Sequence, residues 1–187
     1  MSDSAETLVV GDGPAGLSAA LLLAKKGERV HVLGKNASKM NQAHMYNYPG
    51  VRQISGEEFI EVSRQQCHYF GAEIHDAHVT SLDKSDGLFV ANTKSGDSFT
   101  GKYLVIATGH FARELPEELG VEVDDKDRIV IDDHSRTSVD RVYAAGVATR
   151  VHKIQATVSV GQGASAALDI IEREQDGRPQ DFDTKIE

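Results

Sequence analysis

The chain has a single cysteine, Cys67, and no tryptophan among its 187 residues. One thiol cannot form an intrachain disulfide, which excludes a disulfide scaffold. Basic residues are also scarce: 20 Lys and Arg stand against 29 Asp and Glu, so the formal net charge is −9. This acidic balance argues against nucleic acid or an anionic membrane surface as a partner.

Long apolar runs are absent too, and none approaches the length of a membrane-spanning helix. The hydrophobic residues, 40% of the chain, are spread along its length, as in a globular protein that buries a core. With one cysteine and no membrane segment, a cytoplasmic location is the expectation. We expect a single dinucleotide-binding domain, residues 1–175, followed by a polar tail, residues 176–187.

A glycine turn between a strand and a helix is the most informative pattern. Residues 8–10 form a short apolar run typical of a buried parallel strand. Gly11, Gly13 and Gly16 follow in G-x-G-x-x-G spacing, with Pro14 and Ala15 inside the same motif. The first glycine permits the tight turn, the second permits close approach of a pyrophosphate, and the third lets helix and strand pack closely. We therefore predict nucleotide binding at the positive end of the helix.

The next strand, residues 29–33, lacks the acidic residue that binds an adenosine ribose in such units. The positions that follow it are Gly34, Lys35 and Asn36. One interpretation is that backbone groups and Asn36 hold the ribose. A second is that Lys35 and Lys39 select a ligand with an additional phosphate, such as NADP. A third is that these lysines belong to a solvated surface loop.

The remaining pattern alternates strands and helices. We expect helices over residues 57–71 (after a capping box of Ser55 and Glu58) and 155–175, strands over 72–82, 103–107, 129–131 and 142–145, a hairpin of 88–93 with 98–100, and an acidic loop over 110–127. This order indicates an α/β protein: a three-layer, Rossmann-like fold of the FAD/NAD(P)-binding type, with a central parallel sheet and a small antiparallel β layer.

Four segments in order resemble the FAD domain of thioredoxin reductase-like flavoproteins, in the pyridine nucleotide-disulfide oxidoreductase superfamily. They are GDGPAG at 11–16, NYPG at 47–50, YLVIATG at 103–109, and VYAAGVAT at 142–149 with QATVSVGQGASAA at 155–167. The resemblance covers about residues 5–175. It implies that the glycine turn holds the pyrophosphate of FAD and that relatives pair as homodimers through this domain.

The resemblance also implies a set of cofactor-binding positions. Ala107, Thr108 and Gly109 would lie beside the adenosine half, and Gln155 and Ala156 would face the flavin O2 from the start of the last helix. The complete expected set is Gly11, Gly13, Pro14, Ala15, Gly16, Gly34, Lys35, Asn36, His44, Ala107, Thr108, Gly109, Gly146, Val147, Gln155 and Ala156.

Several departures from the family pattern limit the expected chemistry. The acidic residue after the second strand is Gly34, and the family's A-G-D motif reads Ala145-Gly146-Val147. That aspartate normally accepts a hydrogen bond from the ribityl chain, so each lost contact is expected to weaken FAD binding by about 1–3 kcal/mol. Residues 110–128 stand where the family inserts its NAD(P)H domain, and the C-x-x-C redox pair of that domain is missing.

The leading hypothesis is a minimal FAD-binding oxidoreductase that receives electrons from a small-molecule donor, a diffusing nicotinamide cofactor or a redox partner protein. The first alternative is a non-catalytic dinucleotide-binding sensor or subunit. The second is an NADP-binding protein. No residue is assigned as catalytic.

Other chemically active side chains have ordinary interpretations. Cys67 and His68 are adjacent on a predicted helix and therefore do not face each other, so we expect a buried or idle thiol. His75 and His78 would point to opposite faces of one strand, and no metal site is predicted.

Two loops could also border the ligand. His44 and His110 lie in segments near the expected cofactor. Tyr46 and Tyr48 could stack on the flavin, but we favour packing beneath the loop.

Overall fold

The computed structural model describes residues 3–109, 114–150 and 152–175. Its strands are β1 (Asp3–Val10), β2 (Val30–Gly34), β3 (His44–Met45), β4 (Ile54–Ser55), β5 (Glu73–Asp76), β6 (Val79–Ser85), β7 (Leu88–Thr93), β8 (Ser98–Ile106) and β9 (Val142–Ala144). Its helices are α1 (Pro14–Lys25), η1 (Lys39–Gln42), α2 (Gly56–Tyr69), α3 (Glu114–Glu118), η2 (Gly146–Thr149) and α4 (Ala156–Gln175), of which η1 and η2 are 3-10 helices. None of the helices described is long and apolar enough to cross a membrane.

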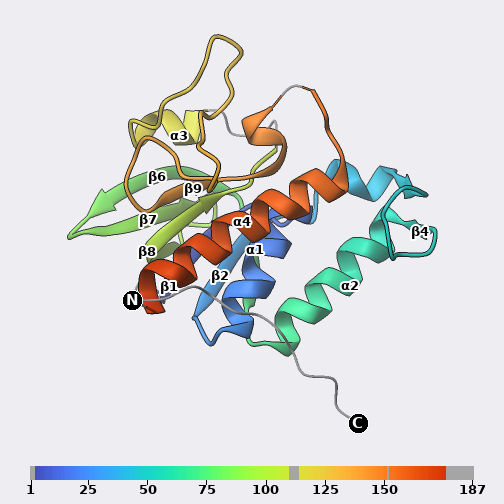
Figure 1. The fold of residues 1–187 in the computed structure, drawn as a ribbon. Coiled ribbons are helices and arrows are strands. Elements are labelled where there is room, and N and C mark those ends of the chain that lie inside the picture. Colours follow the sequence, from blue (N-terminus) through green and yellow to red (C-terminus); the bar gives the residue numbers. More distant parts are fainter. Residues whose placement is uncertain (1–2, 110–113, 151, 176–187) are drawn as a thin grey trace.

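Within the described residues, a 7-stranded sheet runs in the order β5-β2-β1-β8-β7-β6, and β9 also pairs with β8. Figure 1 labels all of these strands except β5. β5, β2, β1, β8 and β9 are parallel, whereas the hairpin of β6 and β7 joins β8 in antiparallel fashion. A separate antiparallel pair, β3 and β4, forms a second small sheet. The α/β class, with its central sheet and small antiparallel part, is confirmed.

Strand β8 is shared by both kinds of pairing. Its first half, Ser98–Gly101, pairs with β7, and its last residues, Leu104–Ile106, pair in parallel with β9. The hairpin strand and the buried strand expected separately are therefore one continuous strand.

Two other strand predictions need correction. The single strand predicted over 72–82 is two strands, β5 and β6, because the chain leaves one edge of the sheet and re-enters at the other. The strand predicted at 129–131 is wrong, since only an isolated bridge joins Ile129 to Val123.

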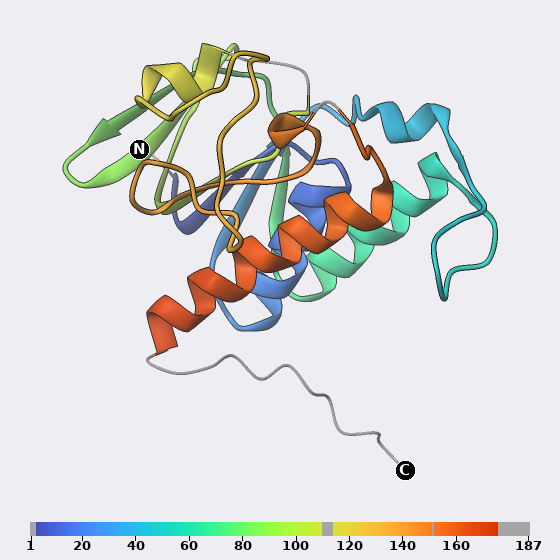
Figure 2. The ribbon, with the colours of Figure 1, turned by 45° about the horizontal axis from the view of Figure 1, so that its top comes forward.

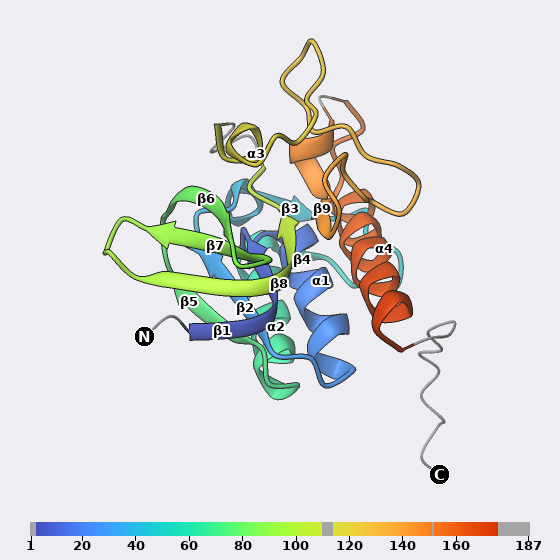
Figure 3. The same ribbon diagram turned by 90° about the vertical axis from the view of Figure 1, so that its left-hand side faces the viewer.

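Helices α1, α2 and α4 cover one face of the sheet (Figures 2 and 3). Their apolar residues pack on Val9, Val32, Val105 and neighbouring side chains. On the opposite face the β6–β7 hairpin and α3 enclose a second apolar cluster, which includes Leu8 and Phe89. The burial of both faces agrees with the sequence of β2, whose five residues are all buried and, apart from His31, have no polar side chain.

Helix α4 packs directly on α1, and Gly163 makes this possible. A Cβ at residue 163 would overlap the backbone carbonyl of Ala15. Further along α4, the buried Asp169 accepts hydrogen bonds from Arg136 Nε and Tyr143 Oη, both at 2.7 Å. Burial raises the pKa of the Asp169 carboxyl, but these two donors outweigh it and hold the pKa below its usual value. The packing at Gly163 and the hydrogen bonds of Asp169 hold α4 against α1 and β9.

Glu28 is a partly buried carboxyl at the opposite end of the sheet. Its side chain accepts a 3.0 Å hydrogen bond from Thr7 Oγ1. Burial, helped by the charge of Glu6, outweighs that bond and raises the pKa of Glu28 from 4.5 to about 7.

Candidate dinucleotide-binding site

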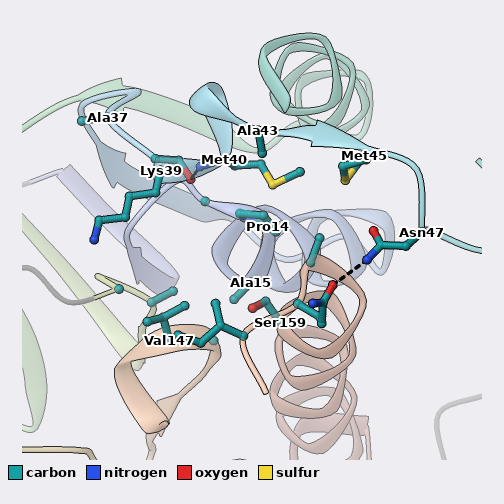
Figure 4. A pocket seen from close by; sticks show the side chains of 18 of the residues that line it. Pro14, Ala15, Ala37, Lys39, Met40, Ala43, Met45, Asn47, Val147 and Ser159 are labelled. Carbon is teal, nitrogen blue, oxygen red and sulfur yellow. Dashed lines mark hydrogen bonds between the residues drawn. The ribbon is translucent and has the colours of Figure 1, made fainter. Parts of the chain in front are cut away.

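Two adjoining cavities open at the carboxyl ends of the parallel strands. The first, about 410 Å³, is lined by the starts of α1 and α4, the loop 37–47, and parts of 107–109 and 146–147 (Figure 4). The second, about 570 Å³, is lined by the ends of β1 and β2, residues 77–80, Thr108 and Leu115. Both cavities receive residues from the glycine turn and from the segment after β8, and Ala37 lines both.

The glycine turn has the geometry that its sequence predicts. Gly11 has a φ of 114°, and a Cβ there would overlap the carbonyl of Ala107. A Cβ on Gly16 would overlap the carbonyl of Gly11, which shows the close helix–strand contact expected of the third glycine. Gly13 precedes α1, with Pro14 in its first turn and no side-chain cap. The first-turn N–H groups of α1 are therefore available to an anion.

Asp12 explains why residue 34 is a glycine. A Cβ on Gly34 would overlap the Asp12 carboxyl group, so Asp12 occupies the space in which a side chain at position 34 would begin. The Asp12 side chain is only 7% exposed, and its Oδ2 accepts hydrogen bonds from Arg64 (2.7 Å) and from Asn36 N (2.8 Å). A buried carboxylate therefore does stand at the end of β2, but it comes from the glycine turn.

Sequence reasoning overlooked Asp12 because it fills a variable position of the G-x-G-x-x-G motif. The available signal was that the sequence has a glycine after β2, at residue 34, and also a carboxylate inside the glycine turn, at residue 12. Only the parallel pairing of β1 with β2, which places Val10 opposite Leu33, shows that the next residues share one space.

The start of α4 is tied to the loop that carries the NYPG motif. Asn47 Nδ2 donates a 2.9 Å hydrogen bond to Gln155 Oε1, drawn as the dashed line in Figure 4. Ala156 is the first residue of α4, and both Gln155 and Ala156 line the first cavity. Two segments far apart in the sequence are thereby joined across one end of this cavity.

The segment at Gly146 forms the floor of the first cavity. Gly146 N donates a 2.8 Å hydrogen bond to Gln162 Oε1, which also accepts a bond from Thr149 Oγ1. The Val147 side chain lines the cavity and offers no acceptor to a ligand (Figure 4). The missing aspartate is therefore not replaced by a polar atom of residue 147.

The other predicted ligand-contacting residues divide between the cavities. Lys35 lines the second cavity with Asp12, whereas Lys39 and His44 line the first. Figure 4 shows the Lys39 side chain directed away from Asn47 and Ser159. Asn36 lies outside the lining of both cavities. Its backbone has a φ of 49°, and its N–H donates a hydrogen bond to Asp12 Oδ2.

The two tyrosines behave differently. The Tyr48 ring packs 5.7 Å from that of Phe59, as the packing interpretation predicts. Tyr46 is 76% exposed and lies beside the His44 ring instead. His110 falls outside the described residues.

Cys67 is fully buried and faces the backbone of α1. Its Sγ donates to the carbonyl oxygen of Leu17 at 3.3 Å. Burial raises the pKa of the thiol to about 12, despite the nearby Arg64 charge. Only the thiolate is reactive, and with this pKa the Cys67 thiol stays protonated at neutral pH. This environment agrees with the expectation of an idle thiol.

The sequence profile described as "Pyridine nucleotide-disulphide oxidoreductase" matches residues 5–116 and 111–163, most of the chain. The chain belongs to this family. The two matched segments meet at 111–116, inside the stretch where the FAD-domain resemblance places the missing NAD(P)H domain. The family's members are FAD-dependent oxidoreductases, and with one cysteine the chain has no C-x-x-C pair.

Individual relatives are similar over part of their length. The chain is 33% identical to a thioredoxin reductase of Helicobacter pylori over 54% of this chain and 34% of the relative. It is 30% identical to a ferredoxin–NADP reductase of Ignicoccus hospitalis over 75% of this chain and 48% of the relative. The chain thus spans about a quarter to a half of the length of the curated relatives it matches.

Solved structures show the same fold at low sequence identity. A thioredoxin reductase from Gloeobacter violaceus superposes with a TM-score of 0.88 at 21% identity, covering 98% of this chain and 100% of that one. The atypical thioredoxin reductase TRi from Desulfovibrio vulgaris Hildenborough gives 0.82 at 20% identity, covering 94% and 99%.

Proposed function

We propose that the chain binds FAD across the two cavities and acts as a minimal flavin-dependent oxidoreductase. The observation that carries this proposal is that the glycine turn and the segment after β8 contribute to both cavities. A dinucleotide spanning them would pass its diphosphate over the first-turn N–H groups of α1. A bound flavin supplies electron transfer, and the chain supplies binding and orientation.

The residues present fit such a cofactor at its centre. Gly11 closes the turn against Ala107, and Gly13 leaves room for the diphosphate to approach the backbone. Thr108 and Gly109 would border the ligand from the end of β8. This cradle is made of backbone groups, so the side-chain departures from the family pattern do not remove it.

At the adenosine end, we assign the ribose hydroxyls to Asp12. Asp12 Oδ2 accepts both of the described hydrogen bonds, and Oδ1 retains capacity to accept one from a ribose hydroxyl. Asp12 lines the second cavity and stands at the end of β2, where a carboxylate normally meets the ribose. The lost contact predicted from Gly34 is, in this proposal, supplied by another residue.

At the flavin end, the start of α4 would face the pyrimidine carbonyl. Partial positive charge at a helix N-terminus stabilises negative charge that develops on the reduced ring. The bond from Asn47 holds Gln155 at this position. Val147 provides no acceptor for the ribityl chain, so FAD is held less tightly than by an aspartate at this position.

The same arrangement favours FAD over NADP. Lys35 lines the second cavity, but so does the Asp12 carboxylate. A 2′-phosphate beside that carboxylate would meet like charge, whereas ribose hydroxyls would meet an acceptor. Lys39 borders the other cavity, so the two lysines do not line one shared cavity.

The electron donor in this proposal is external, either a nicotinamide cofactor that diffuses in, a small molecule or a partner protein. The alternative is a non-catalytic dinucleotide-binding sensor or subunit. The lack of an acceptor at Val147 favours this alternative. The two differ in whether the bound flavin turns over. Homodimer formation remains a prediction.

The decisive experiment compares the purified chain with Gly13→Ala and Gly161→Ala. Gly13 has a φ of −84°, and a Cβ there would lie 3.4 Å from Ser38 Oγ, so alanine fits the folded backbone. That methyl group would nevertheless occupy the approach of the diphosphate. A Cβ on Gly161 would meet open space, which makes Gly161→Ala a matched control.

We expect FAD fluorescence to be quenched on binding to the wild type and to Gly161→Ala, with at least about tenfold weaker affinity for Gly13→Ala. Anaerobic NADPH or NADH should then bleach the bound flavin if the chain is a reductase. Bound flavin that no donor reduces would support the binding module instead. A chain that takes up neither FAD nor NADP at millimolar concentration refutes dinucleotide binding.

A further inference from the structure

Two histidines and a glutamate converge on the face of the sheet opposite the helices. His31 lies on β2, and Glu73 and His75 lie on β5, the edge strand beside it (Figure 3). The register pairs His31 with Glu73 and Leu33 with His75, so alternation of side chains puts all three on one face. Their nearest ligand atoms lie within 4.8 Å of one another.

The distances suit a small divalent cation. His31 Nδ1 and His75 Nε2 are 2.7 Å apart, and Glu73 Oε2 lies 3.9 Å from the first and 4.0 Å from the second. Two nitrogens bound tetrahedrally to zinc at about 2.0–2.1 Å lie about 3.3 Å apart. The imidazoles would separate by about half an ångström and the carboxylate would approach by a similar amount, within the reach of side-chain rotation.

The three side chains differ in exposure, and the most exposed of them, Glu73, is the one that has to approach the imidazoles. The His31 side chain is 4% exposed and packs beside Phe99, whose ring also contacts His75. The Glu73 side chain is 65% exposed and can move toward the imidazoles. Two imidazole nitrogens in hydrogen-bond contact share one proton, and a cation can take that proton's place while adding the carboxylate as a third ligand.

We propose that His31, Glu73 and His75 form a divalent-metal site that takes Zn²⁺, completed by water. Three protein ligands of this His₂Glu type leave a fourth position open to solvent. None of the three residues lines either dinucleotide cavity, so the site is independent of the proposed cofactor. The cation joins edge strand β5 to β2 and stabilises the strand that ends at the adenosine cavity.

Sequence reasoning missed this site because it compared His75 with His78. His75 lies on β5 and His78 follows that strand, whereas the partner of His75 is His31 on β2, the neighbouring strand of the sheet. No local spacing motif connects positions 31 and 75.

The test uses the full chain without a histidine tag, stripped with a chelator and titrated with Zn²⁺ and Co²⁺. We expect one equivalent to bind, a rise in Tm with Zn²⁺, and the visible absorption of tetrahedral Co²⁺. His75→Ala should abolish the Co²⁺ spectrum, and Glu73→Gln should weaken Zn²⁺ affinity by about tenfold. Both side chains are at least partly exposed, so these variants are expected to fold.

His68→Ala removes an exposed histidine on α2 and serves as the control, with unchanged metal affinity expected. The proposal is overturned if the wild type binds no Zn²⁺, or if His75→Ala and Glu73→Gln bind it as the control does. FAD binding of the same proteins is measured separately. Its outcome tests the proposed function and not the metal site, because none of the three residues lines a dinucleotide cavity.

Discussion

Replacing Gly34 by alanine tests whether Asp12 truly occupies the end of β2. The backbone at residue 34 does not adopt a positive φ, so alanine causes no conformational strain there. Its Cβ would overlap the Asp12 carboxyl carbon and lie 2.5 Å from Asp12 Cβ, about 1 Å inside ordinary contact. The Asp12 side chain must therefore leave its position.

That displacement breaks the bonds to Arg64 and Asn36 N. Overpacking typically costs about 1–3 kcal/mol, and hydrogen bonds to a charged group contribute about 1.5–3 kcal/mol. The Arg64 side chain is 20% exposed, so water can replace part of its lost hydrogen bond and the two costs do not add in full. We therefore expect Gly34→Ala to lower the free energy of unfolding by about 3 kcal/mol. Asp12→Gly, which removes the same bonds without overlap, should cost about 2–3 kcal/mol.

The double variant Asp12→Gly/Gly34→Ala distinguishes this mechanism from two independent defects. With the Asp12 side chain gone, a Cβ at 34 has room, so the double variant should be about as stable as Asp12→Gly alone. The coupling free energy from urea denaturation of the four proteins should then equal the cost of Gly34→Ala alone, about 3 kcal/mol. Effects that simply add, within about 0.5 kcal/mol, would refute the shared space.

FAD affinity provides a second readout of the same cycle. Asp12→Gly should bind FAD at least about tenfold more weakly, because the ribose loses its acceptor. Asp12→Gly/Gly34→Glu moves the carboxylate to the end of β2 and should recover much of that loss. If Asp12→Gly binds FAD as the wild type does, the assignment of the ribose to Asp12 is wrong.

Three further outcomes are expected. Val147→Asp should raise FAD affinity about tenfold by equilibrium titration, since it adds an acceptor at a half-buried cavity wall; unchanged affinity would contradict the placement of the ribityl chain. Gly163→Ala should lower Tm because its Cβ meets the Ala15 carbonyl, whereas Gly161→Ala on the same helix should stabilise by about 0.5–1 kcal/mol; equal effects would contradict the packing of α4 on α1. Glu28 binds its proton more tightly when folded (pKa about 7, against 4.5), so its contribution is complete below pH 4.5 and is lost as the pH rises to about 7. The difference in unfolding free energy between Glu28→Gln and the wild type should therefore favour the variant more at pH 8 than at pH 5, by about 1–2 kcal/mol after allowance for solvent screening. Identical pH profiles of the two proteins in urea denaturation would contradict the raised pKa.

Local patterns were sufficient for the parts of this molecule that depend on neighbouring residues. The glycine turn, the α2 helix with Ser55 Oγ accepting from Glu58 N, and the start of α4 near Gln155 all follow from spacing along the chain. The turn is predictable because a positive φ at Gly11 and close contact at Gly16 are requirements of consecutive residues.

What the sequence by itself determined was therefore the α/β class and the location of the backbone cradle. Only the tertiary structure decided which side chains meet around this cradle, and which meet at the His31–His75 pair, which lines neither cavity. Asp12 meets the position vacated at Gly34, Asn47 reaches Gln155, and His31 meets His75, each across more than twenty residues of sequence. These meetings depend on strand order and register, which arise from the packing of the whole sheet and leave no periodic signal in the chain.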